Sequence, residues 1–116
     1  RATMGSNNLI VNIVTSIGLS AMARTTLLKI ISANTVKALK MSEPKFAVTM
    51  QSDGSVILDG KFVPAAVVTV ISDRKLTSDS MLELQAGVSA AFRQGFPIEP
   101  KNIKFAFLDN RSSTQD

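Results

Sequence analysis

The sequence predicts an α/β (α+β) fold in which two βαβ repeats form one four-stranded mixed sheet with two helices on one face. The chain has 116 residues, of which 45% are hydrophobic and 19% charged, a composition typical of a single globular domain. Each half has the order strand, loop, helix, strand, and Glu43-Pro44-Lys45 returns as Glu99-Pro100-Lys101 at the same helix-to-strand junction. Strands joined by such a crossover are parallel, so each half predicts one βαβ unit.

The first repeat is expected over about residues 9–60 of a single domain at 9–116. Residues 1–8 have no pattern and are expected to be a disordered lead-in or a tag remnant. The apolar run from Leu9 predicts a buried strand, Gly18 and Ser20 indicate a loop, and the apolar spacing predicts a helix over 25–40. Strands are expected at 45–51 and, after a turn, at 56–58.

The second repeat is expected over about residues 61–109. Residues 65–72 are the most strand-like run in the chain. Ser80 and Glu83 match a capping box, in which Glu83 caps the start of a helix that runs to about Gln94, followed by a C′ glycine at Gly95. A last strand is expected at 102–109.

The predicted strands are apolar on both faces, whereas two helices can cover only one face of the sheet. The other face therefore needs a cover from outside the chain. Self-association is the economical way to supply it.

The residue types that are missing exclude much chemistry. The chain has no Cys, His, Trp or Tyr, so it has no disulfide, thiolate nucleophile, Cys/His zinc site or histidine base. We expect no metal and no cofactor. The net charge is +4, but the Lys and Arg residues are scattered, which argues against nucleic-acid binding.

The longest mostly apolar stretch is too short and too polar to cross a membrane, and no basic segment precedes it as in a signal peptide. Membrane insertion is therefore not expected. We expect a cytoplasmic protein, with secretion without a signal peptide as the alternative.

Four segments resemble the macrophage migration inhibitory factor and D-dopachrome tautomerase family of the tautomerase superfamily, with almost no gaps between them. They are the first strand from Leu9, the junction and strand at 41–48, the segment 58–66 with Gly60, Pro64 and Ala66, and the last strand at 102–109. The resemblance implies a homotrimer with a barrel of sheets and pockets between subunits. Each subunit would have the two-helix, four-stranded fold predicted above.

Tautomerase activity in this family depends on an N-terminal proline, a secondary amine whose depressed pKa lets it act as a base. The equivalent position in this sequence is about Asn7, and the first proline of the chain is Pro44. The resemblance therefore implies a chain without the catalytic base, and we assign no catalytic residue.

The other family pocket positions are matched by residues of different chemistry. The family lysine falls on Met41 or Ser42, beside Lys40, and the serine of the family Ser-Ile-Gly segment falls on Ser72, followed by Asp73. The family tyrosine and asparagine of the last long strand fall near Lys104 and Ala106. These seven residues are the expected pocket wall.

Three hypotheses follow for the function. The preferred one is a homotrimer of the migration-inhibitory-factor type with lost or reduced keto-enol tautomerase activity. It would act by binding a protein receptor or a small apolar or anionic ligand, in a cytokine-like way. The second is an active phenylpyruvate or dopachrome tautomerase whose N-terminal proline has been replaced. The third is a βαβ ring-building domain of a secretion system.

Overall fold

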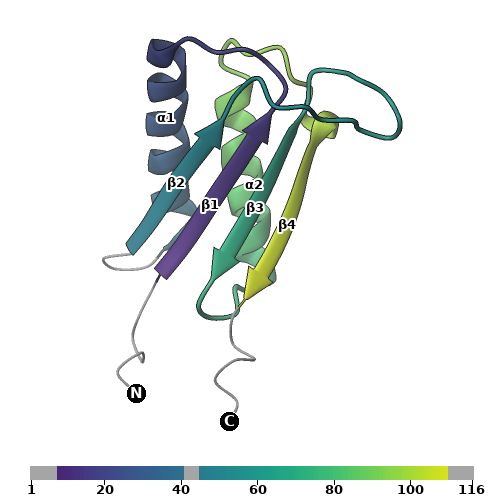
Figure 1. The fold of residues 1–116 in the computed structure, drawn as a ribbon. Coiled ribbons are helices and arrows are strands. Elements are labelled where there is room, and N and C mark those ends of the chain that lie inside the picture. The colour runs from purple at the N-terminus through teal and green to yellow at the C-terminus, as the bar shows by residue number, and fades with distance from the viewer. Residues whose placement is uncertain (1–7, 41–44, 110–116) are drawn as a thin grey trace.

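Two helices lie against one face of a four-stranded sheet in the computed structural model, which describes residues 8–40 and 45–109 (Figure 1). The elements in chain order are β1 (Asn8–Thr15), α1 (Ala21–Leu39), β2 (Lys45–Gln51), β3 (Ala66–Ser72), α2 (Ser78–Phe92), the 3-10 turn η1 (Pro100–Asn102) and β4 (Ile103–Asp109). The strand order is β2-β1-β3-β4.

The pairing of the strands confirms the two βαβ repeats and the mixed sheet. Strand β1 runs parallel to β2, and β3 runs parallel to β4, each pair being joined through one helix. The two repeats meet where β1 and β3 pair in the antiparallel direction, with Val11 opposite Val70. The start of β1 therefore lies beside the end of β3.

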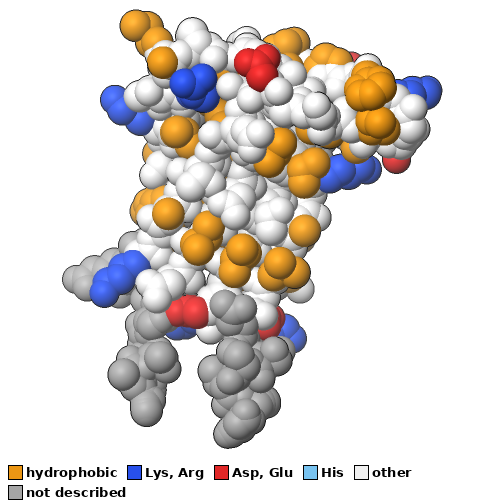
Figure 2. All heavy atoms as spheres, viewed as in Figure 1, with side chains coloured by type: hydrophobic (Ala, Val, Ile, Leu, Met, Phe, Trp, Pro, Cys, Tyr) orange, Lys and Arg blue, Asp and Glu red, His pale blue; other side chains and the backbone are white. Residues whose placement is uncertain are grey.

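Burial alternates along the central strands, as expected for strands that pack on one face. In β1, Leu9, Val11 and Ile13 are buried beneath the helices, whereas Ile10 is exposed on the opposite face. We call this opposite side of the four strands the bare face. Figure 2 shows that hydrophobic side chains are spread over it among polar ones.

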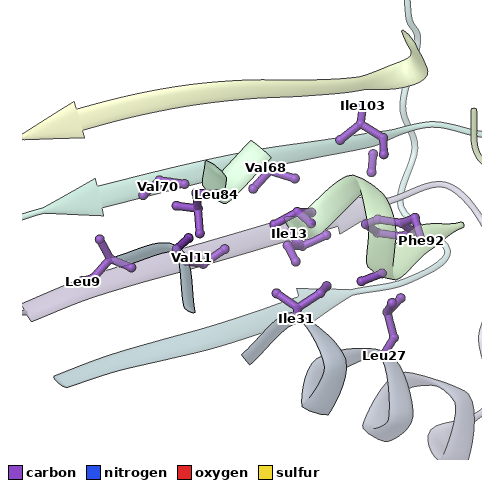
Figure 3. Packing of buried hydrophobic residues seen from close by; sticks show 14 of the residues in the cluster. Leu9, Val11, Ile13, Leu27, Ile31, Val68, Val70, Leu84, Phe92 and Ile103 are labelled. Carbon is purple, nitrogen blue, oxygen red and sulfur yellow. The ribbon is translucent and has the colours of Figure 1, made fainter. Parts of the chain in front are cut away.

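The core lies between the sheet and the two helices (Figure 3). Leu27 and Ile31 of α1, and Leu84 and Phe92 of α2, are fully or almost fully buried against the apolar residues of β1 and β3. On α1, Leu27 is buried against the sheet, whereas the neighbouring Leu28 is half-buried.

The predicted start of the first helix at residue 25 is wrong. The helix begins at Ala21, because Ser20 is its N-cap and its side chain accepts a hydrogen bond from the Ala23 backbone N–H at 3.1 Å. The sequence predicts a loop at Ser20, whereas a serine before an apolar periodic run is also a helix-start signal.

The predicted capping box of the second helix is also wrong. The N-cap is Thr77, whose hydroxyl accepts from the Ser80 backbone N–H at 3.0 Å, so Ser80 lies inside the first turn of α2. Glu83 does not cap the helix but forms an ion pair with Lys40. The helix ends at Phe92 rather than at Gln94.

The short strand expected at 56–58 is absent from the described residues. Only an isolated bridge joins Leu58 to Lys61 there, because this segment pairs with its own turn and not with the sheet. The strand predicted at 45–51 is confirmed with the same bounds, whereas β1, β3 and β4 each start one residue away from the predicted position. The turn η1 occupies the residues just before β4.

Candidate functional site

One end of the sheet brings together the start of β1 and the end of β3, where the sequence analysis placed part of the pocket. The Asn8 backbone N–H donates to the Asp73 carboxylate Oδ2 at 3.4 Å, and the Asp73 backbone N–H donates to the Asn8 carbonyl at 3.3 Å. The antiparallel pairing of β1 and β3 causes this juxtaposition. Asn7, Met41 and Ser42 lie outside the described residues.

Ser72 is buried at the same end of the sheet, and its hydroxyl holds the turn that follows β3. The Oγ atom donates to the Arg74 carbonyl at 2.5 Å and accepts from the Arg74 backbone N–H at 3.2 Å. This is the hydroxyl turn that serine favours after a strand. Ser72 therefore positions the backbone around Asp73.

Lys40 lies at the carboxyl end of α1, just before the segment that leads into β2. Its φ of 52° places it in the left-handed region, and its Nζ lies 3.1 Å from Glu83 Oε2 of α2. Both side chains are exposed, so this ion pair adds little to stability. Lys45, the first residue of β2, pairs in register with Asn8, which places the start of β2 at the same end of the sheet.

Lys104 and Ala106 lie on the bare face of β4, away from this end. Lys104 is opposite Val67 and Ala106 is opposite Thr69, whereas Asp109 is opposite Ser72. At about 3.3 Å per residue along a strand, the five residues from Lys104 to Asp109 correspond to roughly 16 Å. One chain therefore does not bring Lys104 or Ala106 to the Asn8 end.

Two hollows adjoin residues of the expected pocket wall, one at Lys104 and the other at Ser72. The larger, of about 740 Å³, lies between the segment 58–64 and the start of β4, and Lys61, Lys101 and Lys104 contribute to its lining. The smaller, of about 220 Å³, adjoins Ser72 and has apolar walls from Leu76, Met81 and Phe107, with Lys75 in its lining.

The pattern analysis did not predict these hollows, since each combines segments that are distant in sequence. The one available signal was Lys101, which follows the repeated Glu-Pro motif and lines the larger hollow.

A polar row crosses the middle of the bare face and was also missed. Thr49 Oγ1 donates to Asn12 Oδ1 at 2.5 Å, and Asn12 is in turn opposite Thr69. The sequence of β1 indicates this polar row, because Asn12 lies between Val11 and Ile13, which point to the opposite, buried face.

The described residues contain neither a group of metal-binding side chains nor a helix that could span a membrane. No group of three or more His, Cys, Asp or Glu residues that could hold a metal ion occurs in 8–40 and 45–109. Over the same residues, neither helix has the length and apolarity needed to cross a membrane.

No family model matches this chain, and neither does any curated protein. Solved structures do match it in three dimensions. MIF2 of Leishmania major has a TM-score of 0.80 at 18% identity, over 90% of this chain and 90% of that chain. The macrophage migration inhibitory factor of Toxoplasma gondii has a TM-score of 0.77 at 21% identity, over 86% and 88%.

A fused 4-OT protein solved as a symmetric trimer matches with a TM-score of 0.66 at 21% identity, over 88% of this chain and 84% of that chain. The class that these likenesses define is the tautomerase fold. Within it, the chain has the fold of the migration-inhibitory-factor structures, as the sequence analysis predicted.

Proposed function

We propose that this chain belongs to the tautomerase superfamily as a homotrimer of the migration-inhibitory-factor type, in which proline-dependent tautomerase activity is lost or strongly reduced. It would act by binding, in a cytokine-like way. We further propose that it resides in the cytoplasm or is secreted without a signal peptide. The observation that carries the proposal is position 7 of the sequence, which the resemblance equates with the family's N-terminal proline and which is asparagine in this chain.

The family's catalytic base is the nitrogen of an N-terminal proline, and the resemblance places that proline at position 7, which is asparagine in this chain. The nitrogen of the next residue, Asn8, is a peptide amide that donates a hydrogen bond to the Asp73 carboxylate at 3.4 Å. A peptide amide has no basic lone pair, so Asn8 does not replace the missing proline as a base.

The apolar residues of the bare face favour assembly of several copies of the chain. Ile10, Val67 and Leu108 are exposed there, although the strands that carry them are otherwise packed into the fold. Covering a sheet face that carries large exposed apolar residues lowers the free energy, because it removes apolar surface from water. The 4-OT protein with this fold was solved as a trimer, which supports the same arrangement of copies here.

Trimer formation would also affect the pocket. The end of β4 at Asp109 pairs with Ser72 and therefore lies beside Asp73. Lys104 is five residues and Ala106 three residues away from that end, so only Lys104 and Ala106 of another copy could reach Asp73. We propose that the pocket wall is completed by Lys104 and Ala106 of a neighbouring copy. Lys40, Met41, Ser42, Ser72 and Asp73 of the first copy would form the rest.

A binding role has support from the smaller hollow. Its volume of about 220 Å³ is below the roughly 300–1,000 Å³ of typical ligand pockets, so it has room for only a very small molecule, against an apolar wall formed by Leu76, Met81 and Phe107. Lys75, also in the lining, would pair with a carboxylate. A small apolar or anionic ligand is therefore the class that we propose beside a protein receptor.

A phenylpyruvate ketonisation assay tests the loss of activity. The chain is compared with a version that begins Met-Pro, with proline at position 7, and with a matched version that begins Met-Ala. We expect all three to remain close to the uncatalysed rate, because Lys104 and Ala106 replace the family's tyrosine and asparagine as well. A positioned general base is worth about 100-fold or more, so a working site would be evident.

Each other outcome contradicts the proposal in a distinct way. Turnover by the unaltered chain would show that another base works in the pocket. Strong activity of the Met-Pro version alone would favour an active tautomerase whose N-terminal proline has been replaced.

A further inference from the structure

The larger hollow, of about 740 Å³, has walls from two separate parts of the chain. One wall is the segment 58–64 between β2 and β3, and the other extends from Pro97 through η1 to Lys104 at the start of β4. In Figure 1 these two parts lie side by side at the β4 edge of the sheet. The volume is within the roughly 300–1,000 Å³ of typical ligand pockets, so the hollow can hold an organic molecule.

The first wall has a defined backbone. Leu58 and Lys61 exchange two backbone N–H···O hydrogen bonds of 2.9 and 3.0 Å across a two-residue turn. Asp59 and Gly60 within that turn both have positive φ, 52° and 79°, as a type I′ turn requires. The Lys61 side chain is therefore carried by an ordered, hydrogen-bonded turn.

The second wall is held by the core and by the sheet. Ile98 and Ile103, which flank η1, are both buried. The Asn102 backbone N–H donates to the Glu99 carbonyl at 2.8 Å and closes η1. Lys104 follows in β4, which pairs along its length with β3. The backbone on this side of the hollow is thus fixed as well.

Three lysines line the hollow, and one of them is compensated by a carboxylate. Lys101 Nζ lies 3.5 Å from Glu99 Oε1. Among residues 8–40 and 45–109, neither Lys61 nor Lys104 forms an ion pair, and these two lysines belong to opposite walls. Asp59 is the other acidic residue of the lining. With three cations and two anions, the hollow is positive overall.

We infer that the larger hollow binds an organic molecule with two phosphate groups, one held by Lys61 and the other by Lys104. Because the two amines belong to opposite walls, they suit a ligand with an anionic group at each end. A phosphate monoester carries about −1.5 to −2 near neutral pH, more than a carboxylate, so it binds an ammonium point charge more strongly. The apolar side chains of Leu58, Val63 and Pro64 would contact the part of the ligand between its phosphates.

This inference rests on the proposed binding role and deepens it by naming a class of ligand. Both walls belong to one copy of the chain, so the hollow exists without assembly. Lys104 is also proposed to complete the pocket wall of a neighbouring copy. The substitutions that test the hollow are therefore made at Lys61 and Asp59, which have no part in that wall.

Isothermal titration calorimetry with a hexose 1,6-bisphosphate measures the binding, and the hexose 6-phosphate and hexanedioate are the comparison ligands. We expect the bisphosphate to bind at least about 10-fold more tightly than either, because only it offers a phosphate to each lysine. In amide NMR spectra, the bisphosphate should shift mainly the signals of residues 58–64 and 97–104.

Two substitutions are expected to change the affinity in opposite directions. Lys61→Gln should weaken binding of the bisphosphate about 5-fold or more, because it removes one of the two unpaired cations. Asp59→Asn should tighten it about 2-fold, because it removes a repelling charge. Asparagine suits the first central position of a type I′ turn, so the turn should be retained.

The matched control is Lys29→Gln on α1. Lys29 is exposed and does not line this hollow, and its substitution changes the net charge by the same amount as Lys61→Gln. We expect Lys29→Gln to bind the bisphosphate like the unaltered chain. Equal weakening by Lys29→Gln and Lys61→Gln would mean that only the net charge matters, and would overturn the inference.

Equal affinity for the three ligands, or no binding of the bisphosphate, would also overturn the inference. Sedimentation velocity in the same buffer measures the oligomeric state independently. A trimer that does not bind the bisphosphate would overturn the inference and leave the proposed homotrimer standing. A monomer that binds it with the expected preference would support the inference and overturn the homotrimer.

Discussion

Replacing Ile10 by aspartate is expected to convert the assembled protein into folded monomers. Ile10 lies on the bare face near the start of β1, between Ala47 of β2 and Ile71 of β3. Its side chain is 42% exposed in the single chain, so a carboxylate there can remain hydrated while the chain is monomeric. In the proposed trimer the same carboxylate would be buried without a partner.

An uncompensated buried charge costs about 3 kcal/mol or more, and each 1.4 kcal/mol changes an equilibrium constant tenfold. We therefore expect association to weaken more than about 100-fold by these values. Analytical ultracentrifugation over a concentration series measures the change, and circular dichroism shows whether the monomer is folded.

The matched control is Val36→Asp on α1. Val36 is 44% exposed, nearly the same fraction as Ile10, but it lies on a helix and not on the bare face. We expect Val36→Asp to assemble like the unaltered chain. Equal assembly of Val36→Asp and Ile10→Asp would mean that the bare face is not the interface.

Phe92→Ala is expected to cause the largest loss of folding stability. Phe92 is fully buried at the end of α2, and its ring meets Phe96 edge-to-face with centroids 6.3 Å apart. Truncating a buried phenylalanine costs about 3–5 kcal/mol, because it removes apolar contacts and leaves a cavity. That is a large part of the 5–15 kcal/mol that stabilises a typical domain.

Urea unfolding at a fixed protein concentration measures this loss, since assembly makes stability concentration-dependent. Leu82→Ala on the same helix is the control, because Leu82 is exposed, and we expect a change within about 0.5 kcal/mol. A Phe92→Ala variant as stable as Leu82→Ala would contradict the packing of α2 on the sheet.

The architecture could be predicted from the sequence because its signals are local and repeated. The Glu-Pro-Lys motif at positions 43–45 and 99–101 precedes a strand in both halves, and the apolar spacing before it indicates a helix in both. Two similar βαβ units leave few ways to form one sheet. This repetition made the mixed sheet predictable without knowledge of any contact.

Helix starts were less predictable because several residues could serve as the cap. Ser20 and Thr77 cap the two helices, although Ser80 with Glu83 matches the capping-box pattern better. The Thr77 cap brings Ser80 into the first turn of α2 and leaves Glu83 one turn further on, where it reaches Lys40 of the other repeat. That contact depends on how α1 and α2 pack, which no local pattern contains.

The candidate site was the least predictable part, since its residues come from distant segments. Asn8 and Asp73 meet because of the β1–β3 pairing, and this juxtaposition could be expected once the strand order was known. Lys104 lies about 16 Å further along the sheet, by the rise of about 3.3 Å per residue in a strand, so in the proposed trimer another copy of the chain would supply it. A pattern within one chain cannot contain the geometry between copies.

The mass of the unaltered protein in solution tests the central claim most directly. The chain has a mass of 12.4 kDa, so the proposed homotrimer has a mass of about 37 kDa. Sedimentation equilibrium should give a species of that trimer mass that dissociates only on dilution. A single species at the mass of one chain, unchanged as the concentration rises, would contradict the account.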